Sequence, residues 1–444
     1  MCSLYVVFTQ TCGNLHKGNG RAYSAMVFLP LVILGLWAIY YADEKEYKKG
    51  WFYLMVGATG ILETQILGTV MTAMFAVVFM LVSYKKTFTK RTLTALLKTA
   101  VGSILLNLYF LVPFLDMYGS MKLRVGEEHR LIYYFSAFVS QLFSTAYNAA
   151  GDVREDLSGM YHDMPMSLGP VAGVIIIAAL VYLFISKKKY GKKIIITLLL
   201  FITGSIWMAT NLFPYKWLLA HAPFIYSFIE KFEFAWRFLA IATIPIVCLF
   251  VALLVNAQKE FSKKCVMLMG GIICAFYCYQ GADYLFKYNN TMIPFEHEKS
   301  FDELTVGAVY DGQYLPEGFD ENIVNLYPGI TVSDSETVLV DIIERRQLSY
   351  HVVVKNLLQK DAYIELPLLN YKGYSAVSGK EKLLLSSGDN FRVRVALPEE
   401  FEGEIKVFYQ EPWYWRLAEI ISLITMILFI GYVYKEHRNG ESEK

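Results

Sequence analysis

The feature that most constrains this chain is a series of apolar runs whose lengths approach the thickness of a lipid bilayer. A helix needs about 20 predominantly apolar residues to cross the hydrocarbon core. The runs that come near this length are Ser24–Tyr41, Ile66–Val82, Thr99–Leu115, Leu168–Ile185, Ile194–Phe213, Phe238–Val255, Cys265–Gln280 and Leu417–Tyr434. Such a series predicts an α-helical polytopic membrane protein.

Composition supports this class. Hydrophobic residues make up 55% of the chain and charged residues 18%, with a mean hydropathy of +0.37, whereas soluble domains carry roughly 25% charged residues. These values exclude a soluble globular protein and a disordered one. Because 41 Lys and Arg nearly balance 40 Asp and Glu, for a net charge of +1, nucleic acid is not an expected partner.

A shorter apolar run, Trp51–Leu62, stands just before Glu63-Thr64-Gln65. It is interpreted as the rising half of a hairpin whose polar tip is that triplet. The alternative is one long tilted helix from Trp51 to Val82. The hairpin brings the total to nine membrane segments.

Clusters of Lys and Arg predict the orientation, because such residues collect in short cytoplasmic loops. The clusters are Lys85–Arg91, Lys187–Lys193, Lys259–Lys264 and the tail 435–444. Placing them inside puts the segments 116–167, 214–237 and 281–416 outside. The expectation is a multi-pass protein of the cell membrane with its N-terminus outside and its C-terminus cytoplasmic.

Residues 281–416 are predicted to form an extracytoplasmic domain after a bundle at 1–280. Alternating polar and apolar residues predict strands, and the turn signals between them favour a small antiparallel β-sandwich. The predicted strands are Val338–Ile343, Tyr350–Lys355, Tyr363–Pro367, Phe391–Val395 and Glu404–Phe408. The chain returns through Pro412-Trp413-Tyr414-Trp415, an aromatic anchor at headgroup level, to a final helix at 417–434 and a tail at 435–444.

Signatures of common soluble enzymes are missing. The chain has no Gly-x-Ser-x-Gly, no phosphate-cradling glycine loop before Lys-Ser/Thr and no His-Glu-x-x-His. Cys274 and Cys278 share a helix face, but no His or acidic residue stands beside them, so no metal and no cofactor is expected. Few ionisable residues lie within the spans, which weakens a lipid or polymer transporter as a third candidate function.

Polar residues collect instead in the outer segments. Asp116, Glu128 and His129 are candidate catalytic residues, because a carboxylate or imidazole in a membrane–water cleft can act as general base on an acceptor hydroxyl. The alternative is that hydrated loops are simply rich in charge. Residues 131–147 are apolar with few charges and are predicted to lie as a helix in the interface.

The segment Phe232–Leu239, FEFAWRFL, is the most specific of these features. Arg237, flanked by Trp236 and close to Glu233, can bind a phosphate just below headgroup level. The alternative is an Arg that reaches the interface within an aromatic belt. Glu63 and Gln65 tip toward the same face, so that a shared outer cleft is predicted.

Several stretches carry a family resemblance. Phe28–Leu36 and Trp51–Gly68 resemble a span and the next hairpin of bacterial YfhO-like and "6-pyruvoyl-tetrahydropterin synthase-related" membrane proteins, which have a glycosyltransferase-C (GT-C) type architecture. Further resembling stretches are Asn211–Pro214, Glu233–Leu239, Gly312–Pro316, Glu365–Pro367 and Tyr371–Tyr374. The resemblance runs from about residue 20 to the end of the chain.

The resemblance implies an integral membrane glycosyltransferase-like protein with a GT-C-like helix bundle, acting on a polyprenyl-phosphate-linked sugar to glycosylate a cell-wall polymer. The acidic base of such enzymes lies in a first outer loop, which would stand upstream of Met1. A partner chain supplying N-terminal helices is therefore one expectation. The alternative is a non-catalytic relative whose outer β domain binds envelope glycan or a protein.

Overall fold

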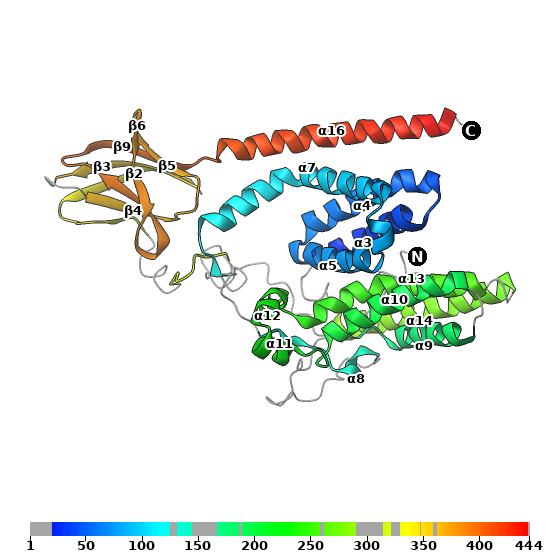
Figure 1. Ribbon diagram of the computed structural model, residues 1–444. Helices are drawn as coiled ribbons and strands as arrows, with labels where there is room; N and C mark the ends of the chain where they lie inside the picture. Colours follow the sequence, from blue (N-terminus) through cyan, green and yellow to red (C-terminus); the bar gives the residue numbers. More distant parts are fainter. Residues whose placement is uncertain are drawn as a thin grey trace. The chain divides into compact units, whose positions relative to one another are not determined.

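The computed structural model describes residues 20–124, 131–143, 167–185, 189–257, 262–289, 314–320, 329–346, 348–357 and 362–442 (Figure 1). The chain divides into two compact units. The first contains Met1–Ser103 and His129–Phe295, and the second contains Ile104–Glu128 and Glu296–Lys444.

The first unit is helical. Its elements are α3 (Gly20–Tyr41), α4 (Glu44–Thr64), α5 (Ile66–Val82), α6 (Tyr84–Thr87), the start of α7 (Lys90–Ser120), η2 (Ile132–Phe135), α8 (Val139–Leu142), α9 (Pro170–Ile185), α10 (Lys189–Ala209), α11 (Tyr215–His221), α12 (Pro223–Glu230), η3 (Ala235–Arg237), α13 (Phe238–Ala257) and α14 (Lys263–Asn289). Helix α14 extends past residue 281, the boundary expected between the bundle and the β domain.

Three helical stretches among the described residues are long and apolar enough to cross a membrane: Lys90–Ser120, Ala235–Ala257 and Trp413–Lys435. Shorter apolar helices are Ala25–Tyr41, Ile66–Val82, Pro170–Ile185 and Ile194–Ala209. The membrane class expected from the sequence is thus supported. Nine segments, a GT-C arrangement and the sidedness of the termini stay predictions.

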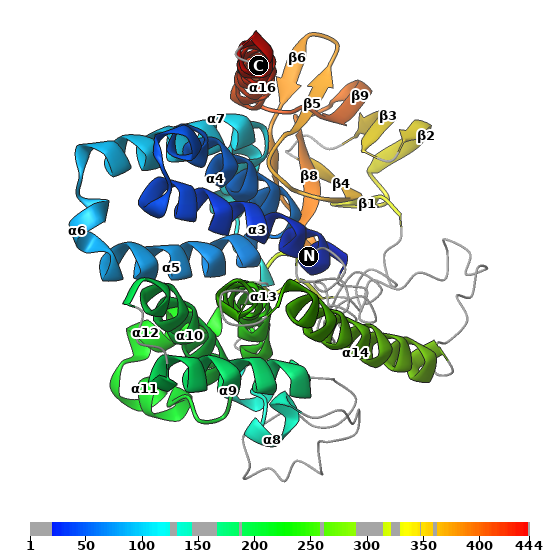
Figure 2. The same ribbon diagram turned by 90° about the vertical axis from the view of Figure 1, so that its right-hand side faces the viewer.

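The chain forms two helices, not one, between residues 51 and 82. Gln65 has an extended backbone (φ −158°, ψ 113°), and α4 ends directly before it while α5 begins directly after it. The long tilted helix is therefore wrong. The main packing partner of α4 is α3, which runs beside it (Figure 2).

Glycines permit this close approach of α3 and α4. A Cβ on Gly35 of α3 would stand 2.4 Å from the backbone nitrogen of Leu54, and one on Gly57 of α4 would stand 2.7 Å from that of Val32. Small residues at helix contacts are typical of membrane bundles, where packing replaces the hydrophobic driving force. Thr99 of α7 donates to the Trp51 carbonyl of α4 (3.1 Å).

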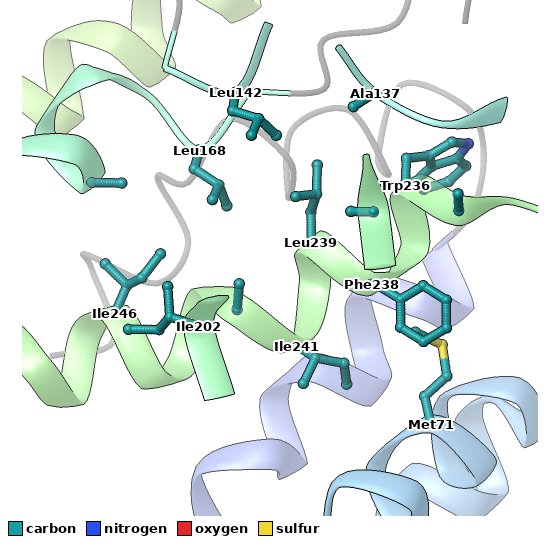
Figure 3. Packing of buried hydrophobic residues seen from close by; sticks show 14 of the residues in the cluster. Met71, Ala137, Leu142, Leu168, Ile202, Trp236, Phe238, Leu239, Ile241 and Ile246 are labelled. Atoms are coloured by element: carbon teal, nitrogen blue, oxygen red, sulfur yellow. The ribbon is translucent and has the colours of Figure 1, made fainter. Parts of the chain in front are cut away.

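Helix α13 forms the centre of the first unit. It is apolar on every face and buried on nearly every face, as expected for a helix surrounded by others. Figure 3 shows Trp236, Phe238 and Ile241 in this core, with Met71 of α5 reaching toward Phe238.

The segment 131–147 is not a single helix over its described part. Residues 132–135 form the 3-10 helix η2 and residues 139–142 form α8, while Ala137 between them pairs with α10 through its amide on the Ala209 carbonyl (2.8 Å). Ile132 and Ala137 have no exposed surface. The predicted single helix is therefore wrong for residues 131–143, because buried residues between and within the two short helices pack against the core. The location of this segment in the interface stays a prediction, and residues 144–147 lie outside the described part.

The second unit carries an antiparallel β domain, as predicted. Its strands are β1 (Thr331–Val332), β2 (Val338–Arg346), β3 (Ser349–Asn356), β4 (Ala362–Leu369), β5 (Tyr374–Ser378), β6 (Glu381–Leu383), β7 (Leu385–Ser387), β8 (Arg392–Leu397) and β9 (Glu402–Tyr409). They form two sheets, ordered β1-β4-β8-β7 and β2-β3-β9-β5-β6. Alternate residues of both sheets share one core, which contains Val352, Ile364, Val395 and Ile405, all without exposed surface.

One buried ion pair fixes the turn between β7 and β8. Glu365 is 2% exposed, and its Oε1 accepts from Arg394 Nε (2.7 Å) and from the Asp389 amide (2.9 Å). Gly388 leaves the space for this carboxylate, because a Cβ there would stand 2.1 Å from Glu365 Oε1.

The second unit also contains the end of α7 and the whole of α16 (Trp413–Ser442). These helices are antiparallel, because Ser422 of α16 contacts Leu105 and Tyr109 of α7 while Trp415 contacts Asp116. Helix α16 begins within the anchor predicted at Pro412–Trp415 and contains the predicted final span 417–434. It continues to Ser442, through most of the predicted tail.

Candidate phosphate-binding crevice

A crevice in the first unit brings together residues from five helical elements. Its walls are Ala25, Met26 and Leu29 of α3, Ile61 of α4, Gly68, Met71 and Thr72 of α5, Trp236 and Arg237 of η3, and Ala240 and Ile241 of α13, with Gln65 at the helix break. The volume is about 50 Å³, space for roughly three to five waters. The crevice is narrow and mostly apolar, with few polar groups.

Arg237 is the cation of this crevice. Its Nη2 stands 3.0 Å from Glu233 Oε2, its Nη1 donates to the Phe232 carbonyl (2.9 Å), and its guanidinium carbon lies 4.7 Å from the centre of the Phe234 ring. The side chains of Arg237 and Glu233 are 14% and 24% exposed. The guanidinium is thus held in place by a carboxylate, a carbonyl and an aromatic face before any ligand arrives.

Local backbone geometry produces this arrangement. The chain leaves α12 at Glu230 and reverses before η3, and Glu233 takes a positive φ of 60° in that turn. A non-glycine residue in this region costs free energy, on the order of 1–3 kcal/mol, and is held there only by its surroundings. The ion pair with Arg237 four residues later is one such restraint. Trp236, 7% exposed, packs into the core beside it.

Gln65 lines the crevice from the break between α4 and α5. Its position at the break places it next to Gly68, where a Cβ would stand 2.9 Å from Gln65 Oε1. Glu63, the other residue predicted for an outer cleft, is exposed and does not line the crevice. Of the five residues predicted for lipid-phosphate binding and the outer cleft, Gln65, Trp236 and Arg237 line it together, and Glu233 contacts it through Arg237.

The structure places Asp116 elsewhere, in the second unit. Its Oδ1 accepts from Lys372 Nζ (2.5 Å), and its Oδ2 accepts from the Tyr414 hydroxyl (2.6 Å) and Trp415 Nε1 (2.9 Å). The hydrogen bond with this carboxylate raises the pKa of Lys372 above its usual value. Both oxygens of Asp116 are engaged in joining α7, the β4–β5 loop and α16. This arrangement favours a structural role for Asp116, which holds these elements together, over a role as general base.

Glu128 and His129, the other predicted catalytic residues, lie outside the described residues. Sequence reasoning missed the partners of Asp116, although the aromatic anchor that supplies Tyr414 and Trp415 was recognised. It also missed the apolar walls of the crevice, because Ala25, Met71 and Ile241 have no signal that separates them from ordinary span residues.

Comparison of the chain with protein-family models, with curated proteins and with solved structures finds no match.

Proposed function

We propose that this chain is an integral membrane protein of the glycosyltransferase-like, YfhO-like type that binds a polyprenyl-phosphate-linked sugar at the crevice beside Arg237, for glycosylation of a cell-envelope polymer. The observation that carries the proposal is the juxtaposition of a fixed guanidinium with a narrow apolar crevice. A polyprenyl phosphate combines the same two chemistries, an anionic head and a thin apolar chain.

The dimensions limit what the crevice can hold. Pockets for drug-sized ligands are roughly 300–1,000 Å³, far above the 50 Å³ here. The crevice therefore takes only the part of the substrate next to the phosphate, and the sugar lies outside it. A phosphate at Arg237 has to share the guanidinium with Glu233 or displace that carboxylate, so Glu233 tunes the affinity.

The non-catalytic alternative has one observation in its favour. Asp116 is the single catalytic candidate within the described residues, and its carboxylate already accepts three hydrogen bonds. A base needs an accessible lone pair at the reacting hydroxyl. Binding of a lipid-linked sugar without transfer is the second function we propose, with the β domain as the site for glycan or a partner protein.

The test is binding of undecaprenyl phosphate by Arg237→Ala in detergent. Loss of a charge-assisted phosphate contact removes about 1.5–3 kcal/mol, so we expect a roughly ten-fold or larger rise in Kd. Arg91→Ala is the matched control, because Arg91 also pairs with a carboxylate, Glu44 (2.9 Å), and stacks on a ring, Tyr47, but lies outside the crevice.

Equal affinities of the two variants and the unchanged protein would refute the proposed site. Both variants are checked for an unchanged melting temperature, so that a loss of binding is not a loss of fold. Transfer of sugar from the bound lipid to an acceptor then separates the transferase from the non-catalytic alternative.

A further inference from the structure

The β2–β3 hairpin lies at the end of the β domain from which α16 leaves. Strand register establishes this: Arg346 pairs with Ser349 within the hairpin, and Ser349 pairs with Phe408 of β9. Strand β9 ends one residue later, at Tyr409, and α16 begins at Trp413. Leu348, in the hairpin turn, is therefore level with the last residue of β9.

Helix α16 fixes where a bilayer would meet this end of the domain. Trp413–Lys435 is long and apolar enough to span, and Trp413, Tyr414 and Trp415 at its start are the residue types that settle at the headgroup level. Three residues separate Tyr409 from Trp413, so the hairpin turn is at most about 14 Å from the interface along the chain direction.

The side chains of the turn suit that environment. Leu348 is 56% exposed, and Ile342 and Ile343 nearby in β2 are 55% and 51% exposed. Arg345 and Arg346 are exposed beside them; Arg346 pairs with Glu344 (2.7 Å), and Arg345 lies over the Tyr350 ring (5.5 Å). Apolar groups flanked by guanidinium groups bind a surface of anionic lipid through both burial and charge.

Basic side chains at this end of the sandwich add a second attraction. Arg345 and Arg346 are exposed in the hairpin, where Arg346 pairs with Glu344, and Lys372 at the same end pairs with Asp116. A negative membrane surface attracts basic residues that lie near it, with about 1 kcal/mol for each residue.

We propose that the β2–β3 hairpin is a second membrane contact of this protein: Leu348 enters the headgroup region while Arg345 and Arg346 bind the phosphates of anionic lipids. The hairpin and α16 together hold the β domain at two points. The occupant of the exposed apolar surface is the lipid of the same bilayer that α16 crosses.

The test uses full-length protein without native cysteines, reconstituted in phosphatidylglycerol-containing vesicles, with one fluorophore on Leu348→Cys. We expect nitroxide lipids with a shallow spin label to quench this probe at least about three-fold more than a probe on Leu357→Cys, because the headgroup region is only roughly 5–8 Å deep. Leu357 is 52% exposed and lies next to the last residue of β3, at the opposite end of the domain.

Two further arms make the result decisive. A probe on Leu428→Cys, 69% exposed in α16, reports whether the helix spans, through quenching by deep nitroxide lipids. Arg345→Glu combined with Arg346→Glu should reduce the shallow quenching at Leu348 in anionic vesicles. Equal quenching at Leu348 and Leu357, while Leu428 is quenched by deep labels, would overturn the hairpin contact without affecting the membrane class or the proposed function.

Discussion

Close packing of α3 on α4 makes Gly35 the position at which the fold can be tested most directly. In Gly35→Val, the new Cβ stands 2.4 Å from the backbone nitrogen of Leu54 and 2.6 Å from its Cβ. Optimal contacts between such atoms are about 3.5–4.0 Å, so the two helices have to separate by about 1 Å. No rotamer change relieves the clash, because its partner is backbone.

The expected cost follows from two opposing effects. Overpacking of a tight contact costs about 1–3 kcal/mol, and the better helix propensity of Val relative to Gly returns only about 0.3–0.5 kcal/mol. We therefore expect a net loss of about 2 kcal/mol in the free energy of unfolding. For a unit of this size the melting temperature falls by about 2–4 °C for each kcal/mol, or roughly 4–8 °C in total.

The assay is unfolding in mixed micelles, followed by far-UV circular dichroism and by thermal melting. Gly204→Val in α10 is the matched control, because a Cβ at Gly204 meets nothing within 4 Å. It should change stability by less than about 0.5 kcal/mol. If Gly35→Val were as stable as Gly204→Val, the close α3–α4 contact would be incorrect.

Two further predictions concern the second unit. Asp116→Ala removes the carboxylate that accepts from Lys372, Tyr414 and Trp415, and should lower the stability of this unit by about 1–3 kcal/mol. The loss is measured as faster proteolysis of the β domain, and Asp116→Asn, which keeps an acceptor oxygen, should have a smaller effect. Unchanged proteolysis of both variants would argue against a structural role for Asp116. Gly388→Ala places a methyl 2.1 Å from Glu365 Oε1, so the buried carboxylate has to shift away from Arg394 and the Asp389 amide, and we expect a loss of about 1–3 kcal/mol in the free energy of unfolding. Thermal melting measures this loss against Gly329→Ala, where a Cβ meets nothing within 4 Å; a Gly388→Ala protein as stable as this control would refute the buried pair.

Local patterns in the sequence predicted most of the long helices and five of the strands. Period-two alternation predicted β2, β3, β4, β8 and β9, because side chains along a strand point alternately to its two faces; the alternation of burial is clearest in β3. Apolar runs predicted the helices for a similar reason, and the polar Glu63-Thr64-Gln65 triplet marked the break between α4 and α5. Both signals depend only on neighbours in the chain.

The candidate site was predicted only in part. Aromatic and charged residues around Arg237 indicated an anion site, and Gln65 was predicted on the same face. The sequence could not show that Glu63 is exposed while Gln65 lines the crevice. Both are polar residues at the end of α4, and the fold decides in which direction each side chain points.

By itself, the sequence determined the membrane class, the helix break and the C-terminal antiparallel β domain, since hydropathy and periodicity are local physical properties. Only the tertiary structure decided that α13 is buried on nearly all sides, that Ala137 pairs with α10, and that Asp116 accepts hydrogen bonds from residues about 250–300 positions away in the chain. The physical reason is that packing partners are chosen by shape and by hydrogen-bond satisfaction across the fold. The sequence shows that Asp116 is a carboxylate, but only its partners in the fold decide whether it acts as a general base or holds elements together.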